Sequence, residues 1–256
     1  MLNIDNPINP RLVKELNSEV LETGLNNGFK SLLAKLNVKI ETIAEDKATF
    51  SNGPKLIISN HHGSIDSVSL LSLIPEKGLH WIGIKFWENL GDVCKDRLLT
   101  AYLSNKEHSH WFERWKYRHY YSRFEGRISR EQAKTKNRQM ITRAAEIINN
   151  GGSVLIFPTG GETFNRTNWK DGIGFLYKQI TNPDLQVIII NIENSGIMEF
   201  VRFLDIPGLN KILGNKTLTI KYNKLSDNEL RNLKILSGKE ISQQLKLYYL
   251  QHFGRL

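Results

Sequence analysis

The run Leu56-Ile57-Ile58-Ser59-Asn60-His61-His62-Gly63-Ser64-Ile65-Asp66 is the part of the chain that best indicates its fold. It begins as a short apolar strand, continues as a polar loop that carries a histidine, and leads into the apolar run 68–74. A strand, a polar loop and a helix in this order are typical of an α/β domain, in which ligands bind beside the carboxyl ends of strands. The run therefore predicts both the class of fold and the place of a site.

His61 and Asp66 stand close enough in this loop for an imidazole and a carboxylate to act as a pair. Asp66 falls at the start of the predicted helix, where the helix dipole favours an ionised carboxylate. It can accept a hydrogen bond from one ring nitrogen of His61 and leave the other nitrogen free as a base. The alternative is an ordinary loop, in which Asp66 only caps the helix.

Further segments extend the pattern in both directions. Apolar residues at spacings of three and four predict a helix over 11–36, broken near Asn26-Asn27-Gly28. Helices are also predicted at 66–74, from an N-cap at Ser129 to about 150, and from a capping box at Ser226 to about 253 with an interruption near 237–238. Strands are predicted at 38–43, 47–50, 55–59, 79–84, 153–157, 185–192 and 217–222.

These elements predict one α/β domain over residues 1–256, with a mixed central sheet flanked by helices. Residues 1–37 are expected to form a helical extension and residues 38–256 the α/β core. A chain of 256 residues is long enough to bury such a core. Residues 86–128 show no clear periodicity and receive no assignment.

The composition restricts the partners and the compartment. A net charge of +9 favours an anionic partner, which can be a phospholipid surface, an acidic carrier protein, a phosphorylated substrate or a nucleic acid. The single cysteine, Cys94, excludes an internal disulfide framework and suits a reducing compartment. No secretory signal and no run of about 18 apolar residues is present. We therefore expect a cytoplasmic protein whose membrane contact is peripheral, on the inner face.

A second polar loop follows the predicted strand 153–157. Its paired glycines, Gly160 and Gly161, expose backbone N–H groups that can form an anion-binding nest. Thr159 and Arg166 add donors for a phosphate or a similar group. The alternative is a plain tight turn. The loop is not a Walker A motif, because no Gly-Lys-Ser/Thr follows at the required spacing.

The segment 108–130 interleaves aromatic and cationic side chains. Such a mixture suits a membrane interface, where aromatic rings lie at headgroup depth. It also suits single-stranded nucleic acid, whose bases stack on the rings. A partly buried helix with a solvated basic face is the third interpretation.

Taken together, these residues resemble the glycerolipid acyltransferase superfamily, the His-x4-Asp acyltransferases. The closest resemblance in style is to the soluble, plastid-type glycerol-3-phosphate acyltransferases and to lysophosphatidic acid acyltransferases. Two departures stand in the third motif, where Thr159 replaces a glutamate and Glu162 an arginine. Four segments resemble the superfamily's motifs in their order along the chain: Asn60-His61 with Asp66, residues 124–127, residues 151–158 and residues 187–190.

The resemblance implies a fold, an activity and roles for particular residues. It implies transfer of a fatty acyl group from acyl-CoA or acyl carrier protein, as co-substrate, to a hydroxyl of a phosphorylated or lipid acceptor. His61 and Asp66 would be catalytic, and no cofactor or metal is implied. The residues assigned to substrate binding are Arg127, Thr159, Gly160, Gly161 and Arg166.

Two other functions stay open at this point. The altered third motif suggests a catalytically weakened relative that binds lipid or an acyl carrier. The aromatic and basic segment suggests a nucleic-acid-binding protein, which is the least favoured of the three.

Overall fold

The computed structural model describes residues 8–44, 50, 53–74, 78–102, 128–159, 169–204, 206 and 208–254. Within this part of the chain, seven strands form one sheet in the order β1-β7-β6-β2-β5-β3-β4. The strands are β1 (Val38–Ala44), β2 (Lys55–Ser59), β3 (Leu79–Gly83), β4 (Leu98–Thr100), β5 (Ser153–Ile156), β6 (Gln186–Glu193) and β7 (Lys216–Lys224).

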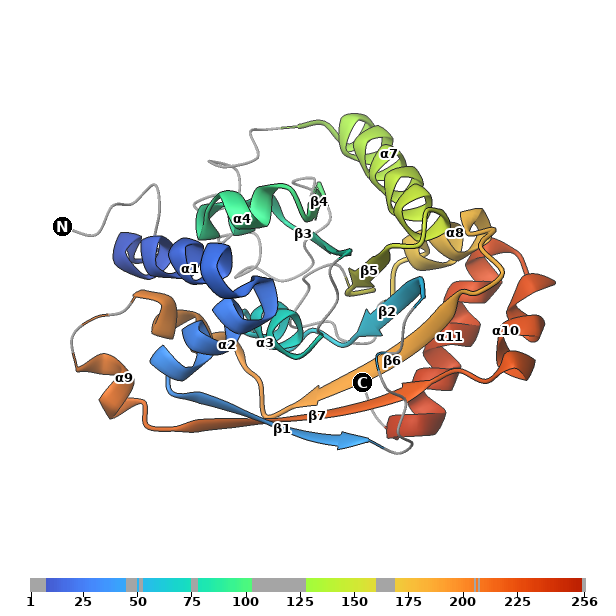
Figure 1. The fold of residues 1–256 in the computed structure, drawn as a ribbon. Helices are drawn as coiled ribbons and strands as arrows, with labels where there is room; N and C mark the ends of the chain where they lie inside the picture. The colour runs from blue at the N-terminus through green and yellow to red at the C-terminus, as the bar shows by residue number, and fades with distance from the viewer. Residues whose placement is uncertain are drawn as a thin grey trace.

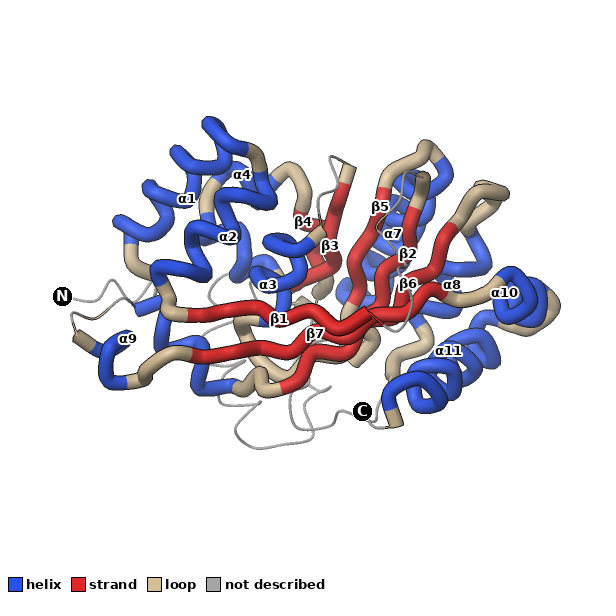
Figure 2. The backbone as a smooth tube through the Cα atoms, turned by 60° about the horizontal axis from the view of Figure 1, so that its bottom comes forward, coloured by secondary structure: helices blue, strands red, loops and turns tan. Residues whose placement is uncertain are grey.

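The sheet is mixed because one pair of neighbours runs antiparallel. β2 is parallel to both β5 and β6, and β3 is parallel to β5 and β4. β7 is antiparallel to β6 and parallel to β1. Five neighbouring strands therefore end at the same edge of the sheet, and this edge includes the carboxyl end of β2 (Figure 2).

Helices cover both faces of the sheet (Figure 1). On one side lie α1 (Pro10–Thr23), α2 (Leu25–Lys35), α3 (Asp66–Leu73), the 3-10 helix η1 (Lys85–Leu90) and α4 (Asp92–Lys95). On the other lie α7 (Arg130–Asn149), α8 (Gly172–Gln179), α10 (Asp227–Lys234) and α11 (Gly238–Phe253). The 3-10 helix η3 (Ile197–Leu204) and the short α9 (Leu209–Ile212) connect β6 to β7.

Two hydrophobic cores follow from the alternation of side chains along the strands. In β2, Ile57 faces the core shared with α1, α2 and α3, whereas Leu56 and Ile58 face the core shared with α7, α8 and α11. A strand whose alternate residues enter two cores must be apolar throughout. This explains why β2 reads as a continuous apolar run.

The predicted fold class, a mixed α/β sheet flanked by helices with helices at the N-terminus, is confirmed. The predicted N-cap at Ser129, the predicted capping box at Ser226 and the predicted interruption before α11 are also present. The division into one domain over 1–256 stays a prediction. The predicted strand at 47–50 lies outside the described residues except for Phe50, which is not in a strand.

The predicted break of the first helix at Asn26-Asn27-Gly28 is wrong. The chain breaks instead at Gly24, whose φ of 89° lies outside the helical region. Gly28 lies within α2, where a Cβ would come 2.3 Å from Cγ2 of Val20 in α1. This glycine therefore serves the close approach of two helices rather than a turn. The short elements η1, α4, β4, α8, η3 and α9 were not predicted.

Candidate active site

The carboxyl end of β2 lies in the middle of the edge where the parallel strands end. All five residues of β2 are buried, and the loop 60–65 leaves from this point to reach α3, which begins at Asp66. The loops that follow β5 and β6 leave from the neighbouring strands. The structure thus brings the loop 60–65 and the described first residues of the loops after β5 and β6 to one edge of the sheet, as expected for a ligand site in an α/β fold.

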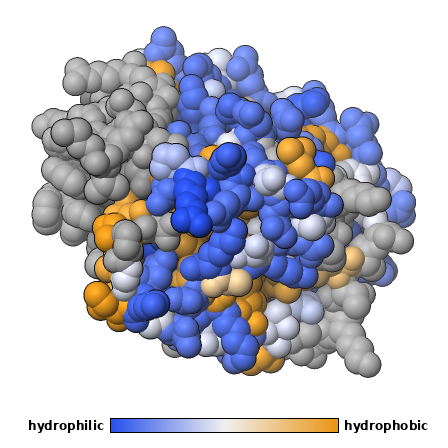
Figure 3. Space-filling model, turned by 60° about the vertical axis from the view of Figure 1, so that its left-hand side comes forward, coloured by the Kyte–Doolittle hydropathy of each residue, from blue (hydrophilic) through white to orange (hydrophobic). Residues whose placement is uncertain are grey.

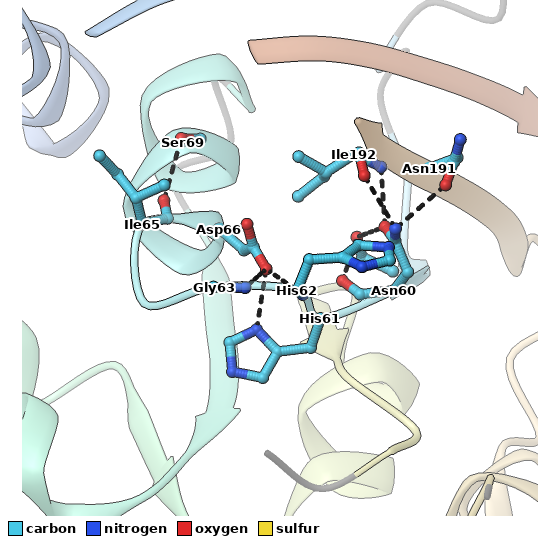
Figure 4. Close-up of polar contacts among 10 residues, drawn as sticks. Asn60, His61, His62, Gly63, Ile65, Asp66, Ser69, Asn191 and Ile192 are labelled. Atoms are coloured by element: carbon cyan, nitrogen blue, oxygen red, sulfur yellow. Dashed lines mark hydrogen bonds and ion pairs between the residues drawn. The ribbon is translucent and has the colours of Figure 1, made fainter. Parts of the chain in front are cut away.

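Asn60 anchors the first loop to β6 through its side chain. Its Nδ2 donates to the carbonyl of Ile192 at 2.9 Å, and its Oδ1 accepts from the N–H of Ile192 at 2.7 Å. The amide therefore pairs with the backbone N–H and C=O of one residue of β6, as a residue of a neighbouring strand would (Figure 4). Asn60 is 4% exposed, so these bonds form away from water.

His61 and Asp66 are in direct contact. Nδ1 of His61 lies 3.0 Å from Oδ2 of Asp66 (Figure 4). The backbone N–H groups of His62 and Gly63 donate to the same oxygen at 2.6 and 2.8 Å. The carboxylate is fully buried, and three donors at one oxygen fix its orientation. The other oxygen, Oδ1, has no hydrogen-bond partner among the described residues.

The second ring nitrogen of His61, Nε2, points away from Asp66 (Figure 4). Within the described part of the chain it makes no hydrogen bond, and the His61 side chain is 14% exposed. The ring lies beside Phe157, with ring centroids 4.7 Å apart and an interplanar angle of 36°. Phe157 comes directly after β5, so the second strand of the site limits how the imidazole can turn. The sequence pattern did not indicate this contact.

Gly63 lets the loop after β6 come against the loop after β2. A Cβ at this position would lie 2.3 Å from the carbonyl oxygen of Gly196 and 2.6 Å from Oγ of Ser195. No side chain fits in this space unless backbone moves. The glycine is therefore required by the close approach of the two loops, and the sequence could not show which segment it would meet.

The second predicted loop is described only at its start. Thr159 is 2% exposed, and its Oγ1 has no hydrogen-bond partner among the described residues. It follows β5, on the edge where His61 lies. The other residues predicted to bind substrate, Gly160, Gly161, Arg166 and Arg127, lie outside the described residues, as do Glu162 and the aromatic and basic segment apart from 128–130.

Two further residues reach the site and were missed. Asn191 in β6 accepts at Oδ1 from Nδ2 of Asn60 at 3.0 Å and from the hydroxyl of Tyr249 in α11 at 2.6 Å. A single asparagine within the apolar run of β6 was the available signal for Asn191, because a buried amide needs partners. No signal in the sequence indicated Tyr249.

The described residues include neither an ionised cysteine nor a cluster of metal ligands. Burial raises the pKa of the Cys94 thiol to about 12, so this cysteine stays protonated at neutral pH. No group of three or more His, Cys, Asp or Glu side chains in the described part of the chain is arranged to hold a metal ion. Among the described helices, none combines the length and hydrophobicity needed to cross a membrane.

Comparisons with known proteins place the chain in a class of enzymes. The model of the family described as Acyltransferase matches residues 35–192, which include the whole of the loop from His61 to Asp66 and Thr159. The chain belongs to the acyltransferase family and is an enzyme of that family. No curated protein matches it.

A solved structure gives a more distant likeness. The chain is similar to the crystal structure of the 1-acyl-sn-glycerophosphate (LPA) acyltransferase PlsC from Thermotoga maritima. The two chains are 14% identical with a TM-score of 0.46, and the match covers 94% of this chain and 77% of that chain.

Proposed function

We propose that this acyltransferase moves a fatty acyl group from acyl-CoA or acyl carrier protein to a hydroxyl of a phospholipid precursor. The acceptor would be of the glycerol-3-phosphate or lysophospholipid type. The observation that carries the proposal is the contact of His61 Nδ1 with the buried Asp66 carboxylate, which leaves the second ring nitrogen unpaired among the described residues. A base held in this way is suited to take a proton from a hydroxyl.

In the proposed reaction, Nε2 of His61 removes the proton of the acceptor hydroxyl as its oxygen attacks the thioester carbonyl. The tetrahedral intermediate then collapses, the carbon–sulfur bond breaks, and the imidazolium returns the proton to the leaving thiolate. The products are an oxygen ester and a free thiol. No covalent bond to the enzyme forms in this sequence of steps.

Asp66 has two roles in this mechanism. It holds the proton of His61 on Nδ1, so that Nε2 is the nitrogen free to act as the base. Its negative charge stabilises the imidazolium that forms when the base takes a proton. Burial strengthens this effect, because the charge acts in a medium of lower dielectric constant than water.

We further propose that the polar loop after residue 157 and the segment 124–127 bind an anionic group of the acyl donor or of the acceptor. Thr159 supports this, because its buried hydroxyl lies on the edge of the sheet where His61 lies and has no partner in the described residues. Gly160, Gly161, Arg127 and Arg166 are proposed as the remaining donors. The net charge of +9 supports attraction of an anionic substrate or carrier.

The same charge supports peripheral contact with an anionic lipid surface. The described residues on the face shown in Figure 3 are mainly hydrophilic, with apolar atoms in separate groups. The exposed aliphatic side chains Leu21, Ile43 and Ile212 can add apolar contact with a lipid surface.

Replacement of His61 tests the proposed base. Purified His61→Ala and wild type are incubated with labelled acyl-CoA or acyl carrier protein and with candidate acceptors. The rate of acyl transfer should fall by about 10²-fold or more, because the general base is lost. The matched control is His80→Ala, since His80 lies near the start of β3, level with Leu56 and away from the carboxyl edge. Equal rates for His61→Ala and wild type would contradict the assignment.

A second candidate function is binding of lipid or acyl carrier with weakened catalysis. The observation that favours it is Thr159, which stands where the resemblance expects a glutamate. Co-sedimentation of the wild type with anionic vesicles, weakened by salt, together with no transfer from any thioester donor, would support this function over the first.

A further inference from the structure

We propose that Tyr249 is a positioning residue for the base His61, acting through Asn191 and Asn60. The inference rests on the proposed function, since it concerns how the same site is held. Tyr249 belongs to α11 and lies beyond residue 192, where the family match ends. The helix that ends the described chain would therefore complete a site built on the family's matched segment.

The hydroxyl of Tyr249 is the first link. It donates to Oδ1 of Asn191 at 2.6 Å, and Tyr249 is fully buried. Its ring is packed edge-on against Trp169 at 5.6 Å and Phe253 at 5.0 Å between centroids. Because two aromatic neighbours hold the ring, the hydroxyl occupies a defined position before any substrate binds.

Asn191 is the second link, and its amide can face only one way. Its Nδ2 donates to Oε1 of Glu193 at 3.3 Å, and a carboxylate can only accept. This turns Oδ1 toward Tyr249 and Asn60, whose donors it receives at 2.6 and 3.0 Å. If the amide were reversed, its nitrogen would face the Nδ2 donor of Asn60, and two donors would oppose each other.

Asn60 is the third link. Its side-chain amide bonds to Oδ1 of Asn191 and to the backbone N–H and C=O of Ile192, and Asn60 directly precedes His61 in the chain. A shift of the Asn60 side chain therefore moves the backbone that carries the imidazole. It also moves the N–H groups of His62 and Gly63 that bind Asp66. Small misplacements of a base cost rate, because proton transfer depends on close and directed approach.

The experiment compares Tyr249→Phe with Tyr248→Phe. Both changes remove one hydroxyl from a buried tyrosine of α11, but the hydroxyl of Tyr248 is not part of the links described above. For Tyr249→Phe we expect kcat to fall by about fivefold or more while KM for the acyl donor stays within about twofold. Tyr248→Phe should leave both values near those of the wild type.

A second measurement does not depend on activity. Hydrogen exchange of the peptide that covers residues 59–66 reports how firmly the N–H groups of His62 and Gly63 are held. This exchange should be about threefold faster or more in Tyr249→Phe than in Tyr248→Phe. Unchanged exchange in this peptide would overturn the proposal, even if the rate of transfer fell.

Asn191→Ala supplies the second variant and completes a double-mutant cycle. In the Asn191→Ala background, Tyr249→Phe should lower kcat by less than about twofold, because the link is already cut. A full, additive loss in this background would overturn the proposal. If the wild type transfers no acyl group, the proposed function fails by itself, and hydrogen exchange in the single and double variants then decides the positioning role.

Discussion

Two regions of the described chain bury a carboxylate, and they treat its charge differently. In the loop after β2, Asp66 binds one histidine and two backbone N–H groups, and its Oδ1 has no partner among the described residues. In η3, Glu199 is paired with the guanidinium of Arg202 at 2.6 Å and with Nζ of Lys216 at 3.2 Å. One carboxylate faces an imidazole, and the other faces an arginine and a lysine.

The surroundings of the two pairs explain the difference. Arg202 also donates to the carbonyls of Leu36, Leu213 and Gly214, so it ties the end of α2 to the segment before β7. A guanidinium only donates hydrogen bonds, and it does not exchange protons with its partners. His61, in contrast, can take up a proton on its second nitrogen while Asp66 holds the first. A buried carboxylate can thus stabilise the fold in one region, while in the other it orients the base that we propose for proton transfer.

The largest effect is expected from Arg202→Met. The change leaves three carbonyls without their donor and removes one of the two cations that pair with Glu199. Loss of one partner of a buried pair costs about 3–5 kcal/mol. Urea unfolding should show this decrease in the free energy of unfolding, while the folded fraction keeps its rate of transfer within about threefold.

The double variant Glu199→Gln/Arg202→Met is the control for charge. It should be more stable than Arg202→Met alone, because the carboxylate that has lost its buried guanidinium is replaced by a neutral amide. If the double variant were the less stable of the two, the pair would not be the source of the effect.

The next effect is expected from Asp66→Asn. The amide oxygen can still accept the three hydrogen bonds, but the negative charge that stabilises the imidazolium is gone. The kcat for acyl transfer should fall by about 10²-fold, and the melting temperature should change by less than about 5 °C. Glu199→Gln should show the reverse, with lower stability and little change in kcat. Equal kcat for Asp66→Asn and wild type would contradict the proposed role of the Asp66 charge in acyl transfer.

The smallest effects are expected from the alanine variants of two glycines, Gly63 and Gly28. A Cβ at Gly63 would meet the backbone of Gly196 at 2.3 Å, and a Cβ at Gly28 would meet Val20 Cγ2 at 2.3 Å. Each alanine variant should lose about 1–3 kcal/mol of stability from overpacking. Only Gly63→Ala should also lower kcat, by about tenfold, because only that loop carries the proposed base, His61. Equal kcat in the two variants would show that the approach of the loops is unimportant for transfer.

Local patterns allowed much of the fold to be predicted. Apolar runs and capping boxes depend on residues close in sequence, and β2, β5, α7 and α11 were found in this way. The elements that were missed, such as α4 and β4, are too short for a periodic pattern to appear. The break at Gly24 was predicted at the wrong place, because a glycine such as Gly28 also indicates the end of a helix. Only the structure shows that Gly28 packs against Val20.

In the candidate site too, local contacts could be predicted and contacts between distant segments could not. His61 and Asp66 could be paired from their spacing, and the structure places them 3.0 Å apart. Two other contacts could not be predicted, those of Asn60 with Asn191 and of His61 with Phe157. They depend on β2 lying between β6 and β5. Strand order is a property of the whole chain, and no local pattern encodes it.

By itself, the sequence determined the alternation of strands and helices, the positive charge, and the loop in which an imidazole and a carboxylate can meet. These follow from residue types and short spacings, which act locally. Only the tertiary structure decided that β6 anchors Asn60 and that Phe157 lies against the His61 ring. It also brought the hydroxyl of Tyr249 in α11 to Asn191. The physical reason is that hydrogen bonds and ring contacts reach only a few ångströms. Residues distant in sequence therefore meet only when the strands are arranged in their order in the sheet.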